Sequence, residues 1–517
     1  MDDETLERDH VFEVAIIGSG FGGLGMAHQL RADGIDDFVV LEQDHHVGGT
    51  WRDNTYPGAA CDVPAHLYSY SFHRYDWSRR YPPHQEILGY IDDVVATFDL
   101  ERHLRFGFAA DRATYDDRSA IWTLTSRAGD RVRARIVVSS VGQLNRPRFP
   151  EIPGRDTFAG VSWHSARWNH EHDLTGRRVA VIGTGASAIQ FVPEVAKQAA
   201  EVHVFQRNAP YVIPKPDGAY TDRQQALFRR FPLLEKADRL SIFLRGELLT
   251  TAILGADLSR KNVEKMWRAH LYEQVADPEL QARCIPDFVI GCNRILFSND
   301  WYPTLASPHV TLVTDGITDV TTDGVVTEDP ISGETQHHEV DVIIYGTGFG
   351  ATGFLQPMEV IGRDGADLQE RWTHGAAAYQ GVSVHGFPNF FMLYGPNTNL
   401  GGNSIIYMLE AQIAYVSQAL AEMRRLDLGS IEVRADEEGE FAAWVDQESR
   451  STAWVTNCHS WYTTEGRNTN NWPALTFRYG RLLDHFELFA YEVEPRPTGS
   501  PPPTSIDGTD LAGSVRR

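Results

Sequence analysis

The stretch GSGFGG at residues 18–23 decides the fold of this chain. It follows a run at residues 11–17 that is apolar except for Glu13, and precedes a segment with helical character at residues 24–30. A second apolar run at residues 38–41 completes a unit of about 30 residues, which predicts a strand, a helix and a second strand. In such a unit the glycines form a tight turn, and a pyrophosphate binds at the helix N-terminus. The stretch therefore predicts a Rossmann-like dinucleotide-binding domain.

Five residues of this unit are candidate cofactor contacts. Gly18 permits the turn, Gly20 leaves room for the phosphates, and Gly23 lets the helix pack on the strand. The backbone of Gly22 is expected beside the phosphates. Glu42 closes the second apolar run 19 residues after Gly23, where a carboxylate accepts hydrogen bonds from both ribose hydroxyls. FAD and NAD both satisfy this pattern.

The same order recurs around GTGASA at residues 183–188, with strands expected at 178–182 and 202–205 and a helix at 186–198. No acidic residue ends this second unit. Arg207 stands there instead, and a guanidinium at that position suits a 2′-phosphate, which favours NADPH over NADH. The candidate contacts in this unit are Gly183, Thr184, Gly185, Ser187, Gln190 and Arg207.

Two nucleotide sites in one chain indicate that electrons pass from a nicotinamide to a flavin. A further strand at residues 340–345 suggests that the second nucleotide domain is inserted in the first. Residues 221–287 are charged, Leu-rich and helical in period. The predicted class is α/β, with two Rossmann-like domains, the second inserted in the first, and a helical subdomain insertion. The predicted parts are an FAD-binding domain (1–145 and 339–493), an NADP-binding domain (146–212 and 287–338), the helical subdomain (213–286) and a Pro-rich disordered tail (494–517).

The composition excludes several function classes. The chain has 517 residues, enough for two or three domains, and a net charge of −23. This charge argues against a nucleic-acid partner and against an anionic membrane surface. No run of about 18 apolar residues occurs, so no membrane span is expected. The N-terminal residues contain no apolar core of a signal peptide, which favours a cytoplasmic location.

The cysteines and histidines suggest neither a disulfide framework nor a metal site. The four cysteines stand far apart, without a C-x-x-C pair, which predicts reduced thiols. Two His-His pairs, at residues 45–46 and 337–338, lack helical spacing to other ligands. We therefore expect no metal. The cysteines are Cys61, Cys284, Cys292 and Cys458.

A third motif lies between the two glycine stretches. Phe158, Gly160, His164 and Trp168 reproduce the F-x-G-x-x-x-H-x-x-x-W fingerprint, which resembles that of Baeyer–Villiger monooxygenases. Related N- and S-oxygenating flavin enzymes usually carry Tyr or Phe in place of the Trp, whereas Asn169 departs from the usual Pro or Asp. The resemblance covers roughly residues 11–491. It includes the motifs GGTW (48–51), YPGAACDV (56–63), GTGF (346–349), GFPN (386–389) and GPNT (395–398).

The resemblance implies an enzyme that uses FAD, NADPH and O2 to insert oxygen beside a ketone carbonyl, giving an ester or lactone through a C4a-peroxyflavin. Arg294, in GCNR at residues 291–294, takes the place of the family's catalytic arginine. A guanidinium does not deprotonate, so it supplies a fixed positive charge to an anionic oxidant. Asp62 matches the carboxylate that orients the arginine. Asn293 replaces a lysine that helps grip the 2′-phosphate, so NADPH preference is expected to depend on Arg207.

The resemblance also implies further cofactor contacts. Thr50 and Trp51 are expected along the FAD phosphates. A helix predicted at about residues 404–423 points its N-terminus at the flavin, where it favours the reduced, anionic ring. His164 is interpreted as a structural residue beside the interdomain linker. The remaining cofactor contacts implied in this way are Asp62, Tyr68, Asn293, Asn397, Thr398, Ile405 and Trp461.

Other functions stay open from the sequence. An N- or S-hydroxylating flavin monooxygenase shares both nucleotide sites. A pyridine-nucleotide:disulfide-type reductase needs a redox cysteine pair near the flavin, and a flavin sensor gives no oxygenated product. The expected partners are a small-molecule ketone and O2, in a monomer or homodimer. The sequence does not specify which ketone.

Overall fold

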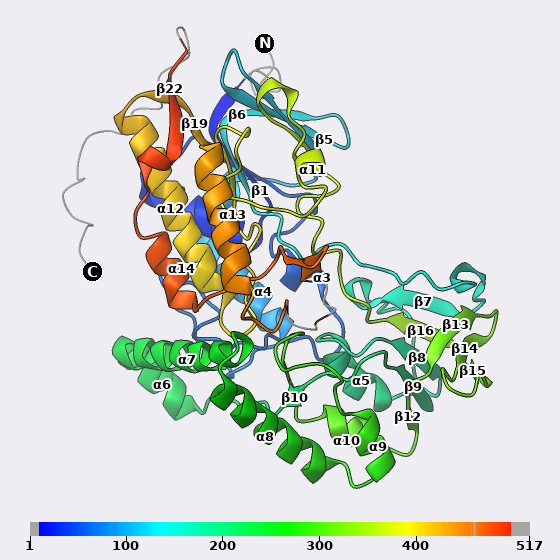
Figure 1. The fold of residues 1–517 in the computed structure, drawn as a ribbon. Coiled ribbons are helices and arrows are strands. Elements are labelled where there is room, and N and C mark those ends of the chain that lie inside the picture. The colour runs from blue at the N-terminus through cyan, green and yellow to red at the C-terminus, as the bar shows by residue number, and fades with distance from the viewer. Residues whose placement is uncertain (1–9, 456–457, 459–461, 498–517) are drawn as a thin grey trace.

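A computed structural model describes residues 10–455, 458 and 462–497. Two separate β-sheets with flanking helices form most of the molecule, and long helices line one edge (Figure 1). The predicted α/β class is confirmed, with parallel strands in both sheets. Within the described residues, no helix is long and apolar enough to cross a membrane.

The first sheet has eight strands in the order β17-β4-β5-β6-β1-β2-β3, with β18 paired to β6. β1 pairs in parallel with β2 and with β6. The pairing of Phe390 in β18 with Val137 in β6 shows that the chain returns to this sheet after a long excursion. The strands are β1 (Val11–Ile17), β2 (Phe38–Leu41), β3 (Leu104–Arg105), β4 (Ala110–Asp116), β5 (Ile121–Ser126), β6 (Arg131–Ser139), β17 (Glu359–Ile361) and β18 (Phe390–Met392).

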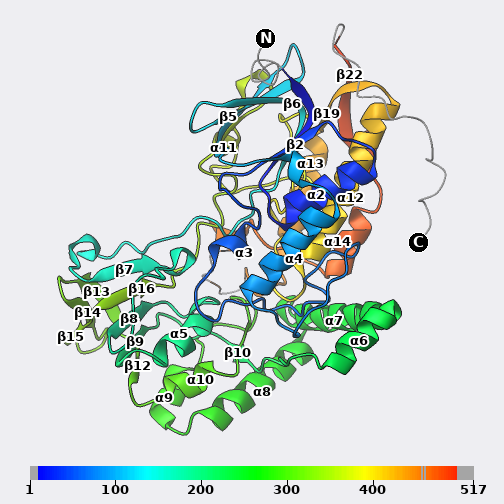
Figure 2. The ribbon, with the colours of Figure 1, turned by 180° about the vertical axis from the view of Figure 1, so that it is seen from behind.

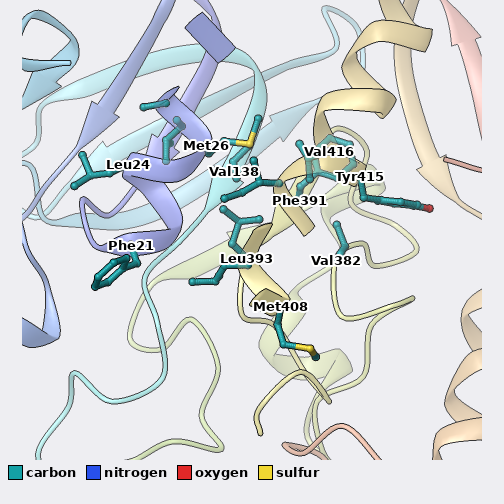
Figure 3. Packing of buried hydrophobic residues seen from close by; sticks show 14 of the residues in the cluster. Phe21, Leu24, Met26, Val138, Val382, Phe391, Leu393, Met408, Tyr415 and Val416 are labelled. Carbon is teal, nitrogen blue, oxygen red and sulfur yellow. The ribbon is translucent and has the colours of Figure 1, made fainter. Parts of the chain in front are cut away.

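Two helices cover one face of this sheet. α2 (Phe21–Ala32) starts at the first glycine turn, and α12 (Ile405–Arg425) packs against it. Figure 3 shows part of the shared core, in which Leu24, Met26 and Met408 are fully buried. Burying each such side chain contributes about 1.5–3 kcal/mol. This packing holds the glycine turn at the carboxyl end of β1.

The second sheet is fully parallel, in the order β12-β9-β8-β16-β7. Its strand β16 corrects one predicted boundary, because this strand pairs with β8 and β7 and not with the first sheet. The return to the first domain therefore follows Tyr345 and does not begin at residue 339. A buried apolar strand has the same pattern in either sheet, so the sequence could not distinguish them. The strands are β7 (Val161–His164), β8 (Arg178–Ile182), β9 (Glu201–Phe205), β12 (Val310–Val313) and β16 (Val342–Tyr345), and α5 (Ala188–Ala196) follows β8.

Four helices follow one another between the strands of the second sheet. They lie along the edge of the molecule opposite β5 and β6 in both views (Figures 1 and 2). Thr221 begins the first of them with a capping box formed with Gln224. The other domain boundaries stay predictions. The four helices are α6 (Asp222–Arg230), α7 (Pro232–Ile253), α8 (Asp257–Gln274) and α9 (Pro278–Arg283).

The remaining elements are shorter or peripheral. The strand β22 (Tyr491–Pro495) pairs with β19 (Leu428–Val433), so the prediction of disorder from residue 494 is wrong for its first two residues, and residues 498–517 lie outside the described part. The other helices are α3 (Thr50–Asp53), α4 (His84–Thr97), α10 (Trp301–Leu305), α11 (Leu368–Arg371), α13 (Ala435–Ser449) and α14 (Thr476–Leu482). The other strands are β10 (Val212–Ile213), β11 (Leu296–Phe297), β13 (Gly316–Val320), β14 (Gly324–Glu328), β15 (Thr335–Glu339), β20 (Thr463–Thr464) and β21 (Arg467–Asn468). Short 3₁₀ helices span Glu101–His103, Arg155–Thr157, Ser165–Arg167, Arg363–Gly365 and Leu488–Ala490.

Two chain crossings connect the two sheets, and they are hydrogen-bonded to each other. The Arg148 N–H donates to the Gly348 carbonyl over 2.9 Å, and the Thr347 hydroxyl donates to the Arg148 carbonyl over 2.5 Å. The ring of His164 contacts Phe149 in one crossing and Phe349 in the other. Burial lowers the pKa of His164 to about 4, so the ring is neutral near pH 7. These contacts support a structural role for His164 at the junction.

Candidate active site

Both glycine turns leave open space at their second glycine. Gly18 and Gly183 have φ of +99° and +108°, a region that favours glycine. A Cβ on Gly23 would lie 1.9 Å from the Gly18 carbonyl oxygen, whereas a Cβ on Gly20 or Gly185 would meet no protein atom within 4 Å. Neither backbone strain nor packing explains glycine at these two positions. The space in front of each fits a pyrophosphate that approaches the backbone.

Glu42 lies at the carboxyl end of the first unit and is almost fully buried. Its carboxylate accepts hydrogen bonds from the Ser19 N–H and hydroxyl, the Asp44 N–H and the Arg52 guanidinium, over 2.6–3.1 Å. These donors fill both carboxylate oxygens. A ribose hydroxyl would therefore bind here in exchange for one of them, and the rotatable Ser19 hydroxyl is the donor that moves most easily.

The loop before α3 brings further predicted contacts to the first glycine turn. The Gly48 N–H donates to the Ser19 carbonyl over 3.1 Å, which places Thr50 beside the turn. The Trp51 indole N–H donates to the Tyr68 hydroxyl over 3.1 Å, and the Tyr68 ring meets Phe21 edge to face. The structure thus brings Thr50, Trp51 and Tyr68 to one side of the first nucleotide site.

The predicted contacts of the second site separate into two groups. Arg207 is exposed two residues after the end of β9 and forms no ion pair with any residue that the structure describes. Gln190 differs, because its amide accepts from the Tyr56 hydroxyl and donates to the Ala60 carbonyl, both over 3.0 Å. Gln190 therefore fastens α5 to the segment at residues 56–60.

Two of the other predicted residues, Thr184 and Ser187, belong to the second glycine turn itself. Thr184 donates its hydroxyl to the Asn208 carbonyl over 3.3 Å. Ser187 stands at the N-terminus of α5 and interacts with the Tyr56 hydroxyl. Asn293 is half-buried beside Arg294. Thr184 and Ser187 therefore flank Gly185 in the chain, whereas Asn293 comes from the segment of Arg294.

Arg294 and Asp62 form a two-bond ion pair between segments 232 residues apart. The Arg294 Nε and Nη2 each donate to a different Asp62 oxygen over 2.8 Å. Asp62 comes from the loop after α3, and Arg294 directly precedes β11, which pairs with β10. The Asp62 charge is the main cause that raises the pKa of Arg294 further above its usual range. The guanidinium is therefore held in one orientation and stays charged.

Three residues that no motif indicated also belong to this neighbourhood. The Arg294 charge lowers the pKa of both Tyr394 and Tyr462, but burial outweighs it and raises the pKa of Tyr462 to about 12. Burial lowers the pKa of the Lys215 amine, while Asp217 and Asp62 oppose that shift. Lys215 is a single lysine between two prolines, and sequence spacing gives no sign of its interaction with the Asp62 charge.

The predicted flavin contacts before α12 are held by internal hydrogen bonds. The Asn397 side-chain amide donates to the Asn468 carbonyl, and the Thr398 hydroxyl donates to the Gly395 carbonyl, both over 2.7 Å. Ser404 caps α12 by accepting from the Ile406 N–H, so Ile405 begins the helix. These side chains position the backbone at the N-terminus of α12. Trp461 lies outside the described residues.

One expectation about the cysteines is wrong. Cys292 and Cys458 form a disulfide between segments 166 residues apart, while Cys61 and Cys284 are free and buried. The pairing joins the segment of Arg294 to the chain after α13. Sequence separation concealed it, because only the folded chain brings the two residues together.

Comparison with known proteins gives this site its context. Residues 15–221 match the pyridine nucleotide-disulphide oxidoreductase family. This range holds both glycine turns but only Cys61 of the four cysteines, so the match concerns the nucleotide domains and not the disulfide.

Over nearly their full lengths, two curated proteins and two solved structures are similar to this chain. A Baeyer–Villiger monooxygenase from Pseudomonas aeruginosa is 42% identical, covering 94% of this chain and 92% of the relative. One from Streptomyces coelicolor is 40% identical, covering 94% and 93%. A steroid monooxygenase bound to NADP (30% identity) and a closed cyclohexanone monooxygenase (28%) each match with a TM-score of 0.83, covering 94% of this chain and 100% and 99% of theirs. With its paired nucleotide folds and the Arg294–Asp62 pair, the chain belongs to the Baeyer–Villiger monooxygenase family.

Proposed function

We propose that this enzyme uses FAD, NADPH and O2 to convert a small-molecule ketone into an ester or lactone, with water as the second product. FAD would bind at the turn with Gly20, and NADPH at the turn with Gly185. When bound, the flavin reduced by NADPH supplies the activation of molecular oxygen. A cytoplasmic location and a monomeric or homodimeric state stay predictions.

The Arg294–Asp62 pair is the observation that carries this proposal. Oxygen insertion places negative charge on the carbonyl oxygen of the ketone, and a fixed cation stabilises that charge best when no reorganisation is needed. Both Nε and Nη2 of Arg294 are held at 2.8 Å from Asp62. Because the raised pKa prevents proton donation, Arg294 acts through its charge and not as an acid.

We propose the following residues as cofactor contacts. For FAD they are Gly18, Gly20, Gly22, Gly23, Glu42, Thr50, Trp51, Asp62, Tyr68, Asn397, Thr398 and Ile405. For NADPH they are Gly183, Thr184, Gly185, Ser187, Arg207, Asn293 and Trp461, with Gln190 supporting α5.

The test uses purified holoenzyme with a panel of aryl, cyclic and linear ketones. NADPH consumption, anaerobic flavin bleaching and product mass are followed together. We expect Arg294→Ala to bleach the flavin at the wild-type rate but to yield no ester, so NADPH oxidation ends in hydrogen peroxide. The matched control is Arg467→Ala, which removes another two-bond pair, with Asp446.

Two results would overturn the proposal. A normal ester yield from Arg294→Ala would remove the guanidinium from the reaction. A wild-type enzyme that oxygenates thioethers or amines but converts no ketone would instead indicate an N- or S-oxygenating enzyme.

A further inference from the structure

α7 exposes five leucines, which are Leu234 and four others that share one side of the helix. Leu233, Leu240, Leu244 and Leu248 have exposures of 77%, 57%, 57% and 66%. Their spacings of seven, four and four residues place them on one side of the helix. We name these four residues the leucine face of α7. The spacing is that of an amphipathic helix, but here the apolar side faces water.

The acidic residues of α7 all turn toward the protein. Glu235 pairs with Arg74 over 2.6 Å, and Asp238 pairs with His66 over 2.8 Å. The buried Glu247 accepts from the Asn403 side chain over 2.8 Å. No acidic residue of this helix is therefore left beside the leucine face.

Cations flank the leucine face. Lys236 and Arg245 are exposed and form no ion pair with any described residue of the chain. The surrounding helices share this balance, because residues 222–283 hold eleven Lys and Arg against nine Asp and Glu, in a chain whose net charge is −23. The bulk charge, which argued against an anionic membrane, conceals this local excess of positive charge.

The charge pattern distinguishes between two occupants of the leucine face. Paired helices of two copies need complementary charges beside their apolar seam, whereas self-pairing of α7 would bring like cations together. A helix that lies in a bilayer interface carries Leu on one side and Lys or Arg beside it. We propose that the leucine face of α7 docks this enzyme on the interface of a lipid bilayer with anionic headgroups.

The position of α7 gives this docking a consequence for the active site. Its inner side holds Asn403, which accepts from the Ser404 N–H at the start of α12. One helix diameter, about 10–12 Å, therefore separates the lipid from the segment that begins α12. Figures 1 and 2 show α6, α7 and α8 along an outer edge of the molecule. Leu258 on α8 adds a further exposed leucine to this edge.

The experiment measures flotation of the full-length holoenzyme with two kinds of vesicle, phosphatidylcholine alone and a mixture with about one third phosphatidylglycerol. We expect binding to the anionic vesicles and several-fold weaker binding to the neutral ones. Leu244→Gln with Leu248→Gln should weaken binding at least about tenfold. The matched control replaces two other exposed apolar residues, Ile331→Gln with Phe489→Gln, and should bind like the wild type.

A second double variant tests the contribution of the two cations to vesicle binding. Lys236→Gln with Arg245→Gln should bind both kinds of vesicle equally. All variants change exposed side chains, so each should keep the wild-type melting temperature, which calorimetry checks. Three results would overturn the proposal: no binding to either vesicle, unchanged binding of the double-leucine variant, or a dimer in sedimentation that only that variant loses.

Discussion

Removing the carboxylate of Asp62 tests how much of the reaction depends on the orientation of Arg294. The two atoms that Asp62 holds, Nε and Nη2, each lie 2.8 Å from a carboxylate oxygen. A hydrogen bond with a charged partner contributes about 1.5–3 kcal/mol. The Arg294 and Asp62 side chains are 33% and 23% exposed, so solvent screening favours the low end, about 1.5 kcal/mol for each bond.

This magnitude predicts a graded response. Asp62→Asn keeps one acceptor and should lower ester formation about tenfold, because about 1.4 kcal/mol corresponds to one factor of ten. Asp62→Ala removes both acceptors and should lower it about 100-fold. The protein should remain folded in both cases, since the pair is partly exposed.

The assay measures ester formed per NADPH consumed and, separately, the rate of anaerobic flavin reduction. Orientation of Arg294 matters for the oxygenation step, so the ester yield should fall while the reduction rate stays within about twofold of wild type. Asp446→Asn is the matched control, because Asp446 also accepts two bonds from one arginine, the exposed Arg467. Wild-type coupling in Asp62→Ala, beside an inactive Arg294→Ala, would refute the reasoning.

Four further predictions concern cofactors, cysteines and pH. Gly20→Ala should fold with the wild-type melting temperature yet purify with little FAD, measured by absorbance, because its Cβ enters space free of protein atoms. Arg207→Gln should raise the KM for NADPH about 10–100-fold and leave the KM for NADH unchanged in steady-state assays. Thiol titration of the denatured chain should count two free cysteines before reduction and four after it. Reduction of Cys292–Cys458 should also lower the melting temperature, because a disulfide across 166 residues restricts the unfolded chain. The pKa of His164 is about 4 in the folded protein, against 6.5 in the unfolded chain. The stability that the neutral ring contributes is therefore full above about pH 6.5 and falls as the pH drops toward 4. Between pH 7.5 and 5, the free energy of unfolding measured in urea should decrease by roughly 1–2 kcal/mol less in His164→Gln than in the wild type.

Each of these predictions has a contrary outcome. Full FAD content in Gly20→Ala would mean that no phosphate approaches that glycine. Equal KM changes for NADPH and NADH would remove the 2′-phosphate from Arg207. Four thiols before reduction would exclude the disulfide, and an unchanged pH profile in His164→Gln would assign the acid instability to other groups.

Local sequence patterns predicted the elements that begin each nucleotide site. The runs at residues 11–17 and 178–182 are strands with those same bounds. Glycine turns and apolar runs are local signals, so neighbouring residues suffice to predict them. The proximity of Arg294 and Asp62 came instead from a family resemblance, since nothing local connects two residues 232 positions apart.

Two kinds of feature could not be predicted from the sequence: which side of a helix faces the solvent, and which distant segments of the chain contact each other. The period of α7 indicates that its leucines share one side, but not that this side faces water while Glu247 faces inward. The strand at Val342–Tyr345 has the same apolar pattern in either sheet, and only its pairing with β8 places it. The Cys292–Cys458 bond and the interaction of Lys215 with the Asp62 charge likewise exist only in the folded chain.

The paired crossings between the sheets restrict how the two nucleotide sites move. A single connecting segment would allow rotation about three axes. Two connecting segments that are hydrogen-bonded between Arg148 and Gly348 permit mainly bending about an axis that passes through both segments. The glycine turn at Gly185 would then travel along one arc relative to the glycine turn at Gly20. A hinge of this kind returns the reacting groups to the same registry after every cycle of coenzyme exchange.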